Sequence, residues 1–225
     1  GKKPAEAGFR LLGAHIDSPR LDLKQHPLYE DTNLALLKTH YYGGIKKYQW
    51  VAMPLAVHGV VVKKDGTVLK VTLGEDDNDP VLGISDLLIH LAAEQMDKKG
   101  PKIIEGEDMN ILVGSMPVKD SEAKEKVKEN ILKLLEEKYG IHEDDFISSE
   151  IEIVPAGKAR DFGIDRSMVM AYGQDDKVCA YTSFEAMLKV NKPEYTCGTI
   201  LVDKEEIGSV GATGMSSMFF ENTVA

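Results

Sequence analysis

The sequence predicts an α/β fold that is interrupted by an inserted β-rich module. Three features predict it: a nearly continuous apolar run near the N-terminus, a region of short alternating runs after it, and a return to strand, helix and strand near the C-terminus. Continuous apolar runs are typical of strands buried on both faces of a parallel or mixed sheet, whereas alternating runs are typical of antiparallel strands. We therefore expect residues 1–20 and 160–225 to form one α/β domain and residues 21–159 to form the insertion.

The first expected strand spans residues 9–16, where the sequence reads FRLLGAHI. Residues 21–73 then carry short alternating runs, and two of them, LAVHGVVV and TVLKVTL, flank the tetrapeptide KKDG. Its Asp65 and Gly66 are a strong hairpin signal, because glycine readily adopts the positive φ that tight hairpin turns require. We expect an antiparallel β region here.

Two helices are expected inside the insertion. Residues 86–96 repeat apolar side chains at the helical period, with Ser85 as a possible N-cap. Residues 121–139 form a second amphipathic pattern, and Gly140 is positioned to end it. We expect one apolar face on that helix, made of Val127, Ile131, Leu134 and Leu135.

The last third of the chain returns to alternating strands and helices. We expect a strand near 167–172, a helix near 177–189 and a strand at 199–203. The last strand runs into a turn rich in glycine, with Gly208, Gly211 and Gly214.

Composition and charge exclude several classes of protein. The chain has 225 residues and a formal net charge of -10. We therefore do not expect it to bind nucleic acids or anionic membranes, which bind to basic surfaces. Cys179 and Cys197 stand in no metal-binding pattern, which favours a reducing, cytoplasmic environment over a disulfide scaffold. No signal peptide or membrane-spanning run is visible. Because the chain starts at Gly1 and stops just after a glycine-rich motif, we expect it to be excised from a longer protein.

The first motif with chemical potential is AHIDSPR, which closes the first expected strand. Ligand sites in open α/β sheets lie beyond the carboxyl ends of the strands. His15 and Asp17 are two residues apart and point to the same side, so the imidazole can bind a metal while the carboxylate orients it. The alternative is a strand-end histidine capped by a turn aspartate, without a metal.

The second motif is GQDDK, at the start of the helix expected near 177–189. A carboxylate can bridge two divalent ions, as in two-metal hydrolases. We favour Asp175 for this role, with Asp176 as the competitor, because either residue could instead be the N-cap of the helix.

The third motif is DKEEIGS, which follows the last expected strand. Consecutive glutamates can divide the work, one binding a metal and the other moving a proton. We assign Glu205 as the general base and Glu206 as the metal ligand; the alternative is surface charge. Histidine and carboxylate donors without thiolates suit zinc, manganese or cobalt.

These motifs, in this order, resemble the M18 (aspartyl aminopeptidase) family of metallo-aminopeptidases. AHIDSPRL, THYYGGIKKYQW, GQDDKVCAYTS and DKEEIGSVGATG all resemble blocks of that family, and the similarity covers essentially the whole chain. The resemblance implies a zinc-aminopeptidase-like α/β/α sandwich interrupted by a β-rich module. It also implies removal of an N-terminal residue, Asp or Glu, from a peptide substrate by a water molecule that two metal ions activate.

The resemblance also implies a role for each matched residue. His15 and Glu206 match metal ligands, Asp175 the bridging carboxylate, Asp17 the carboxylate that accompanies the histidine, and Glu205 the general base. In such enzymes the inserted module serves self-association into a homo-oligomer, and a histidine of a neighbouring subunit completes the site. His90, in DLLIHLAAEQ, resembles that histidine; otherwise it is an ordinary histidine on a helix face.

The chain departs from the family in length. Family members are about twice as long, and two further ligands, an aspartate and a histidine, lie in sequence that this chain does not contain. Each ion would then have about two protein ligands here, whereas catalytic zinc normally has about three. We therefore expect the isolated chain to bind metal weakly. A related metallo-hydrolase acting on another amide, and a non-catalytic oligomeric scaffold, remain the alternative functions.

Overall fold

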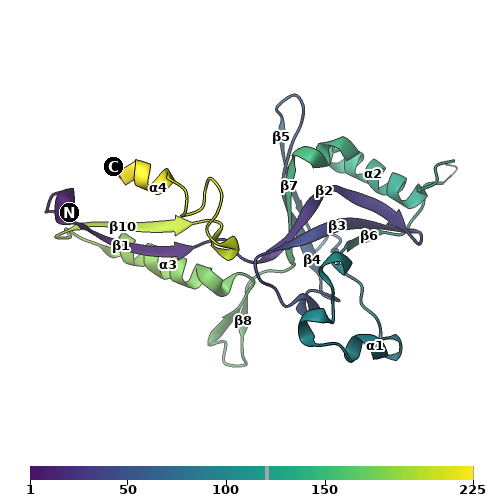
Figure 1. Cartoon of the computed structure of the whole chain (residues 1–225), viewed down its shortest axis with the longest axis horizontal. Coiled ribbons are helices and arrows are strands. Elements are labelled where there is room, and N and C mark those ends of the chain that lie inside the picture. The colour runs from purple at the N-terminus through teal and green to yellow at the C-terminus, as the bar shows by residue number, and fades with distance from the viewer. Residues whose placement is uncertain (120–121, 225) are drawn as a thin grey trace. The chain divides into compact units, whose positions relative to one another are not determined.

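A computed structural model of the chain describes residues 1–119 and 122–224, and it divides into two compact units (Figure 1). Unit 1 combines Gly1–Pro19 with Ala159–Ala225, and unit 2 is Arg20–Lys158. The mixed α/β fold class expected from the sequence is confirmed. None of the helices in the described ranges is long and apolar enough to span a membrane.

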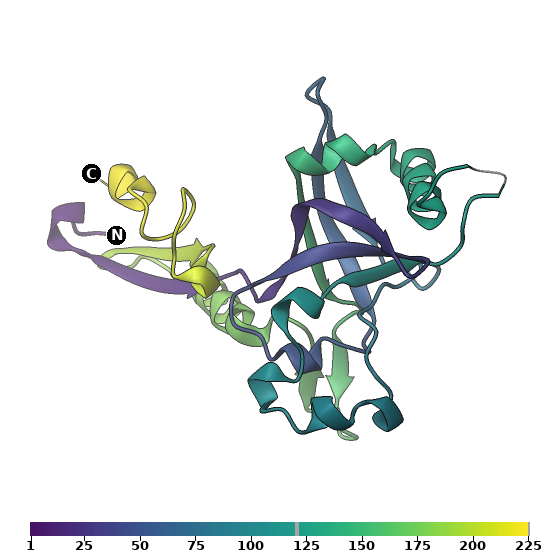
Figure 2. The ribbon, with the colours of Figure 1, turned by 45° about the vertical axis from the view of Figure 1, so that its right-hand side comes forward.

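Unit 1 is built on two parallel strands and one long helix. Strand β1 (Phe9–His15) pairs with β10 (Thr196–Val202) in a register that sets His15 opposite Val202. Helix α3 (Gln174–Lys189) packs against both strands, as Figure 2 also shows. The rest consists of the hairpin β8 (Arg160–Phe162) and β9 (Met168–Met170), the single turns η1 (Ala5–Ala7) and η7 (Glu205–Ile207), and α4 (Phe219–Val224).

The positions of the main elements of unit 1 are confirmed, but the expected burial of the first strand is wrong for this chain. Phe9, Leu11 and Leu12 are each between 39% and 47% exposed. A two-stranded sheet covered by one helix leaves one face of each strand in water, whereas a buried parallel strand needs cover on both faces. The strand expected near 167–172 is also shorter, and it pairs with β8 rather than joining the main sheet.

Unit 2 is a six-stranded antiparallel sheet in the order β5-β4-β7-β2-β3-β6. The strands are β2 (Arg20–Asp31), β3 (Leu34–Tyr42), β4 (Leu55–Val62), β5 (Val68–Leu73), β6 (Ile111–Gly114) and β7 (Ser149–Pro155). Its core includes the fully buried side chains of Leu21, Leu55, Val61, Ile111 and Ile153. The predicted hairpin is confirmed, because β4 and β5 pair across a turn in which Gly66 has a φ of +86°.

Helix α2 (Lys126–Tyr139) packs on this sheet through Val127, which is 2% exposed. The glutamate of β2, Glu30, reaches the start of α2, where its Oε2 accepts hydrogen bonds from the backbone N–H groups of Val127 and Lys128, both at 2.9 Å. The helix ends at Gly140, whose φ of +64° is left-handed, as the sequence predicted.

Parts of the helix predictions in unit 2 are wrong. The structure has α2 start at Lys126, while Ser121, the expected start, lies outside the described residues. Leu134 is 51% exposed, and Leu132 packs on the core instead. Residues 86–96 form only the turn η3 (Ile89–Leu91) and the four-residue α1 (Ala93–Met96), without a cap from Ser85.

The physical reason for the short helix is that most of its apolar stripe has no surface to pack against. Leu87, Leu88, Ile89 and Leu91 are each more than half exposed. An amphipathic period stabilises a helix mainly through tertiary packing of the apolar face, which is missing here. Further short 3₁₀ segments lie in the connections: the single turns η2 (Lys47–Gln49), η4 (Gly100–Lys102) and η5 (Gly106–Asp108), and the six-residue η6 (Glu143–Ser148).

Candidate metal centre

The centre of the candidate site is His15, the last residue of β1, whose side chain is 12% exposed. Its Nδ1 lies 3.1 Å from the carbonyl oxygen of Asp17 and 3.4 Å from the Asp17 carboxylate. Its Nε2 lies 3.2 Å from Asp175 Oδ1 and 3.8 Å from Glu205 Oε2. One ring nitrogen is therefore held by Asp17, and the other faces two carboxylates.

Asp17 connects the end of β1 to the turn after β10. Its side chain is 2% exposed, and its two oxygens accept hydrogen bonds from the backbone N–H groups of Glu205 (3.3 Å) and Glu206 (3.2 Å). The parallel register brings these segments together, because His15 lies opposite Val202. One buried carboxylate thus contacts the histidine and both glutamates of the third motif.

The structure separates the two aspartates that the sequence left open. Asp175 is 87% exposed at its side chain and directs Oδ1 toward His15 Nε2. Asp176 instead accepts a hydrogen bond from the backbone N–H of His15 at 3.4 Å and bonds Cys179, one turn further along α3. Neither aspartate has helical backbone angles, so the regular helix begins at Lys177. Asp176 therefore occupies the capping place, and Asp175 is left to face the histidine.

The carboxylates around His15 change its protonation. Burial acts to lower the pKa of His15, but the hydrogen bond to the Asp17 carbonyl and the charges of Glu205, Asp17 and Asp176 outweigh it, so the pKa is raised above the ordinary value. The raised pKa means that these carboxylates favour the protonated form of the imidazole.

Glu206 shows the complementary effect. Burial raises the pKa of the Glu206 carboxyl, and the neighbouring charges of Asp17, Asp175 and Glu205 raise it further, against a lowering by His15. Burial is thus the main cause of the raised pKa, and the neighbouring carboxylates add to it. A cation at this place would lower this pKa.

The whole chain, residues 1–225, matches the family described as aminopeptidase I zinc metalloprotease (M18). The chain belongs to the M18 family. A relative from Clostridium acetobutylicum, named "Probable M18 family aminopeptidase 1", is 72% identical over 225 residues, which is all of this chain and 48% of the relative. A relative of the same name from Thermotoga maritima is 53% identical over 213 residues, 95% of this chain and 46% of that protein.

Solved structures show the same likeness. The crystal structure of aminopeptidase I from Clostridium acetobutylicum matches with a TM-score of 0.91 at 72% identity, covering 99% of this chain and 49% of that one. The M18 aminopeptidase structure from Thermotoga maritima matches with a TM-score of 0.92 at 52% identity, covering 96% and 47%. The M18 chain described here therefore spans about half the length of the curated relatives it matches.

The donor atoms of the M18 chain suit the zinc that the family description names. Imidazole nitrogen and carboxylate oxygen are common zinc ligands, and a histidine whose second nitrogen is held by a carboxylate or a carbonyl is the usual arrangement around the metal. His15, with Nδ1 on Asp17 and Nε2 toward Asp175, has this arrangement. Over residues 1–119 and 122–224, however, no three His, Cys, Asp or Glu side chains gather closely enough to hold an ion by themselves. The present donors fit the metal chemically but form a partial set.

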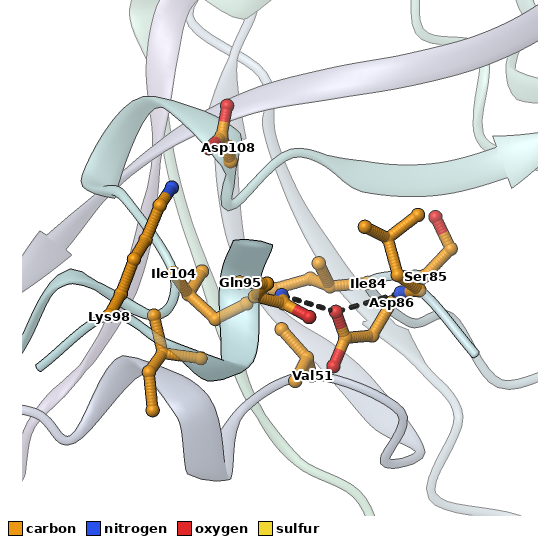
Figure 3. Close-up of a pocket in the computed structure, with 10 residues that line it drawn as sticks. Val51, Ile84, Ser85, Asp86, Gln95, Lys98, Ile104 and Asp108 are labelled. Carbon is orange, nitrogen blue, oxygen red and sulfur yellow. Dashed lines mark hydrogen bonds between the residues drawn. The ribbon is translucent and has the colours of Figure 1, made fainter. Parts of the chain in front are cut away.

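His90 is the one predicted site residue of the M18 chain that belongs to unit 2. It lies exposed in η3. Unit 2 also has a cleft of about 310 Å³ next to this segment (Figure 3). In that cleft, Asp86 Oδ1 accepts hydrogen bonds from Leu87 N and Gln95 Nε2 beside apolar side chains such as Val51 and Ile104. None of the predicted site residues lines this cleft.

Two residues near the centre were missed by sequence reasoning. Ser18 is 5% exposed and its hydroxyl donates to the carbonyl of Asp175, and Lys177 donates to the Ser18 hydroxyl. Both stand inside the recognised motifs AHIDSPR and GQDDK, so their position was the available signal. Residue type alone does not mark a serine or a lysine as part of a metal site.

Cys179 and Cys197 are both free thiols.

Proposed function

We propose that the protein to which this chain belongs is a zinc aminopeptidase that removes N-terminal residues, Asp or Glu, from peptides with the help of two divalent ions. The observation that carries the proposal is the cluster at the end of β1, where Asp175 and Glu205 face the free nitrogen of His15. Membership of a family of zinc metalloproteases and 72% identity to a probable aminopeptidase support it.

In this proposal His15 and Glu206 are metal ligands and the Asp175 carboxylate bridges the two ions. The exposure of Asp175 supports this role, because 87% of its side chain is accessible. Zinc is the expected metal, with manganese or cobalt as substitutes for the same donors. The remaining ligands would come from the part of the relatives' length that this chain does not span.

Divalent ions bound here would polarise the carbonyl of the scissile bond and acidify a water molecule. The protein groups supply the remaining functions. Glu205, whose side chain is 53% exposed, is free to take a proton from water and to pass it to the leaving amine. Asp17 does not reach solvent; it holds the imidazole of His15 by Nδ1 and the two glutamates by their backbone.

We further propose that unit 2 is an assembly module and that His90 acts in the site of a neighbouring subunit. The exposure of His90 among exposed leucines supports this role. A relative from S. cerevesiae at 23% identity has been solved as a dodecamer, which is a statement about that protein. In mixed oligomers, a Glu205→Gln chain would supply His90 to a His90→Ala chain that has an intact Glu205, so activity would reappear on mixing. Two inactive variants that stay inactive when coassembled would contradict action between subunits.

The activity test uses the complete gene product. We expect cleavage of aspartyl and glutamyl anilides, loss of cleavage after chelation, and recovery on addition of zinc. The same protein should not release acetate from N-acetylated amino acids, which separates an aminopeptidase from a deacylase acting with the same donors. A zinc-loaded protein that cleaves no free N-terminus would refute the proposed function, and a preference for leucyl over aspartyl substrates would refute only its substrate class.

A further inference from the structure

Few neighbouring groups hold the side chain of Asp175, the ligand proposed to bridge the ions. The Asp175 carboxylate is 87% exposed, so packing does not set its direction. A metal ligand must keep a defined direction for tight binding, and groups outside the ligand set usually supply it. For Asp175, such groups must act on the backbone.

A short hydrogen-bonded chain does act there. The Ser18 hydroxyl donates to the carbonyl oxygen of Asp175 at 3.3 Å, and the ammonium of Lys177 donates to the Ser18 oxygen at 3.2 Å. A second bond from Lys177 reaches the carbonyl of Ile16 at 3.4 Å. Because a hydroxyl that accepts from a cation becomes a stronger donor, the lysine reinforces the serine's hold on Asp175.

The partners of Lys177 are unusual for a lysine. Within the described part of the chain, its ammonium forms no salt bridge with a carboxylate, although Asp175 and Asp176 directly precede it in sequence. Both bonds go to neutral oxygens of the segment that follows β1. These bonds join the start of α3 to the segment that follows β1.

Gly173, just before the motif, makes room for the pair. A Cβ atom on Gly173 would lie 2.7 Å from Lys177 Nζ and 3.0 Å from Ser18 Oγ. The φ of Gly173 is also +80°, which a side chain disfavours. Any larger residue would displace the ammonium or the hydroxyl. A glycine at this position therefore leaves the space that these two groups occupy.

We propose that Lys177 and Ser18 are positioning residues that fix the Asp175 carboxylate for metal binding through the Asp175 carbonyl. This inference rests on the proposed function, because it concerns the ligand assigned there. Neither residue is expected to touch substrate. The couple explains how an exposed carboxylate can keep its direction toward His15 Nε2, 3.2 Å away.

The test measures zinc affinity of the complete gene product by competition with a chelating indicator. We expect Lys177→Met and Ser18→Ala each to weaken zinc binding by about 10- to 100-fold, the usual effect of losing a group that orients a ligand. The zinc affinity of the double variant should lie within about threefold of that of the weaker-binding single variant, because both changes break the same chain of hydrogen bonds. Lys177→Arg should recover part of the affinity. The matched control is Lys189→Met, at the exposed end of the same helix, which should bind zinc like the wild type.

The direction of the change decides between two roles for Lys177. Removing a positive charge beside a cation site strengthens cation binding if the lysine acts only through its charge. Unchanged or tighter binding in Lys177→Met, or additive losses in the double variant, would overturn the inference. Melting of the zinc-free variants shows whether folding is kept; should Lys177→Met not fold, Ser18→Ala carries the same test. Zinc affinity can be measured without turnover. A wild type that cleaves no peptide would therefore refute the proposed function, while the zinc affinities of the variants would still test the positioning role.

Discussion

Replacing Asp17 by asparagine tests the most buried element of the candidate site. Both carboxylate oxygens are engaged: one accepts from Glu205 N and lies 3.4 Å from His15 Nδ1, and the other accepts from Glu206 N. Asparagine has the same shape, but one of its two ends is an NH₂ group that can only donate. In either orientation, a donor would then face a backbone N–H in a place that is 2% exposed.

The magnitude follows from that mismatch. One backbone N–H, of Glu205 or of Glu206, loses its acceptor in a buried place, which costs about 1–3 kcal/mol of folding free energy. The substitution also removes the negative charge that lies 3.4 Å from His15 Nδ1, while the Asp17 carbonyl at 3.1 Å stays in place. Loss of a charged group that orients a metal-binding histidine weakens metal binding by about 10- to 100-fold. We therefore expect the Asp17→Asn protein to fold, to be less stable than the wild type and to have a lower zinc affinity.

Two measurements follow the two effects. Thermal melting of the zinc-free protein reports the change in stability. Amide hydrogen exchange should be faster than in the wild type at Glu205 or at Glu206, whichever N–H loses its acceptor. Competition with a chelating indicator reports zinc affinity. The matched control is Asp144→Asn, the same chemical change at an exposed place in η6, which should alter none of these values. Wild-type exchange at both glutamates in Asp17→Asn would refute the reasoning, because it would mean that the carboxylate does not hold the turn.

Three further predictions concern other contacts. Glu205→Gln should lower kcat by about 10²- to 10⁴-fold, as expected for loss of a general base, while zinc affinity stays near that of the wild type; a parallel loss of zinc would make it a ligand instead. Glu30→Ala should lower the free energy of unfolding in urea by about 1–2 kcal/mol, since it removes a charged cap from the start of α2. The control, Glu137→Ala on the exposed side of that helix, should change this free energy very little. Thr39→Val should cost about 1–3 kcal/mol, because Thr39 is 2% exposed and its hydroxyl donates to the carbonyl of Met109. Wild-type unfolding in urea would contradict this.

Elements governed by local chemistry could be predicted from sequence. The Asp65-Gly66 turn and the Gly140 helix end are both present, because a positive φ at glycine is a property of the residue itself. Strand β10 and the regular part of α3 were found for the same kind of reason, since their apolar periods are long and end in clear signals.

Elements that depend on a packing partner could not be predicted as well. The period of residues 86–96 is helical, yet the chain there forms only short turns, because its apolar side chains find no surface to cover. The exposure of β1 has the same origin: a sequence shows that a strand is apolar but not how many neighbours cover it. From sequence we favoured Asp175 over Asp176, although either could cap the helix. The contacts that distinguish the two side chains are tertiary: Asp176 accepts from His15 N, and Asp175 lies beside His15 Nε2.

The sequence by itself determined which residue types could form a metal site and that each group follows an apolar strand or opens a helix. Local hydrogen bonding and hydrophobic periodicity suffice for that, because they act over a few residues. Only the tertiary structure decided that His15 meets Asp175, 160 residues later in the chain, and that Asp17 receives the backbone of Glu205, 188 residues away. The physical cause is the parallel pairing of β1 with β10 and the packing of α3 on both, long-range contacts that no local pattern encodes.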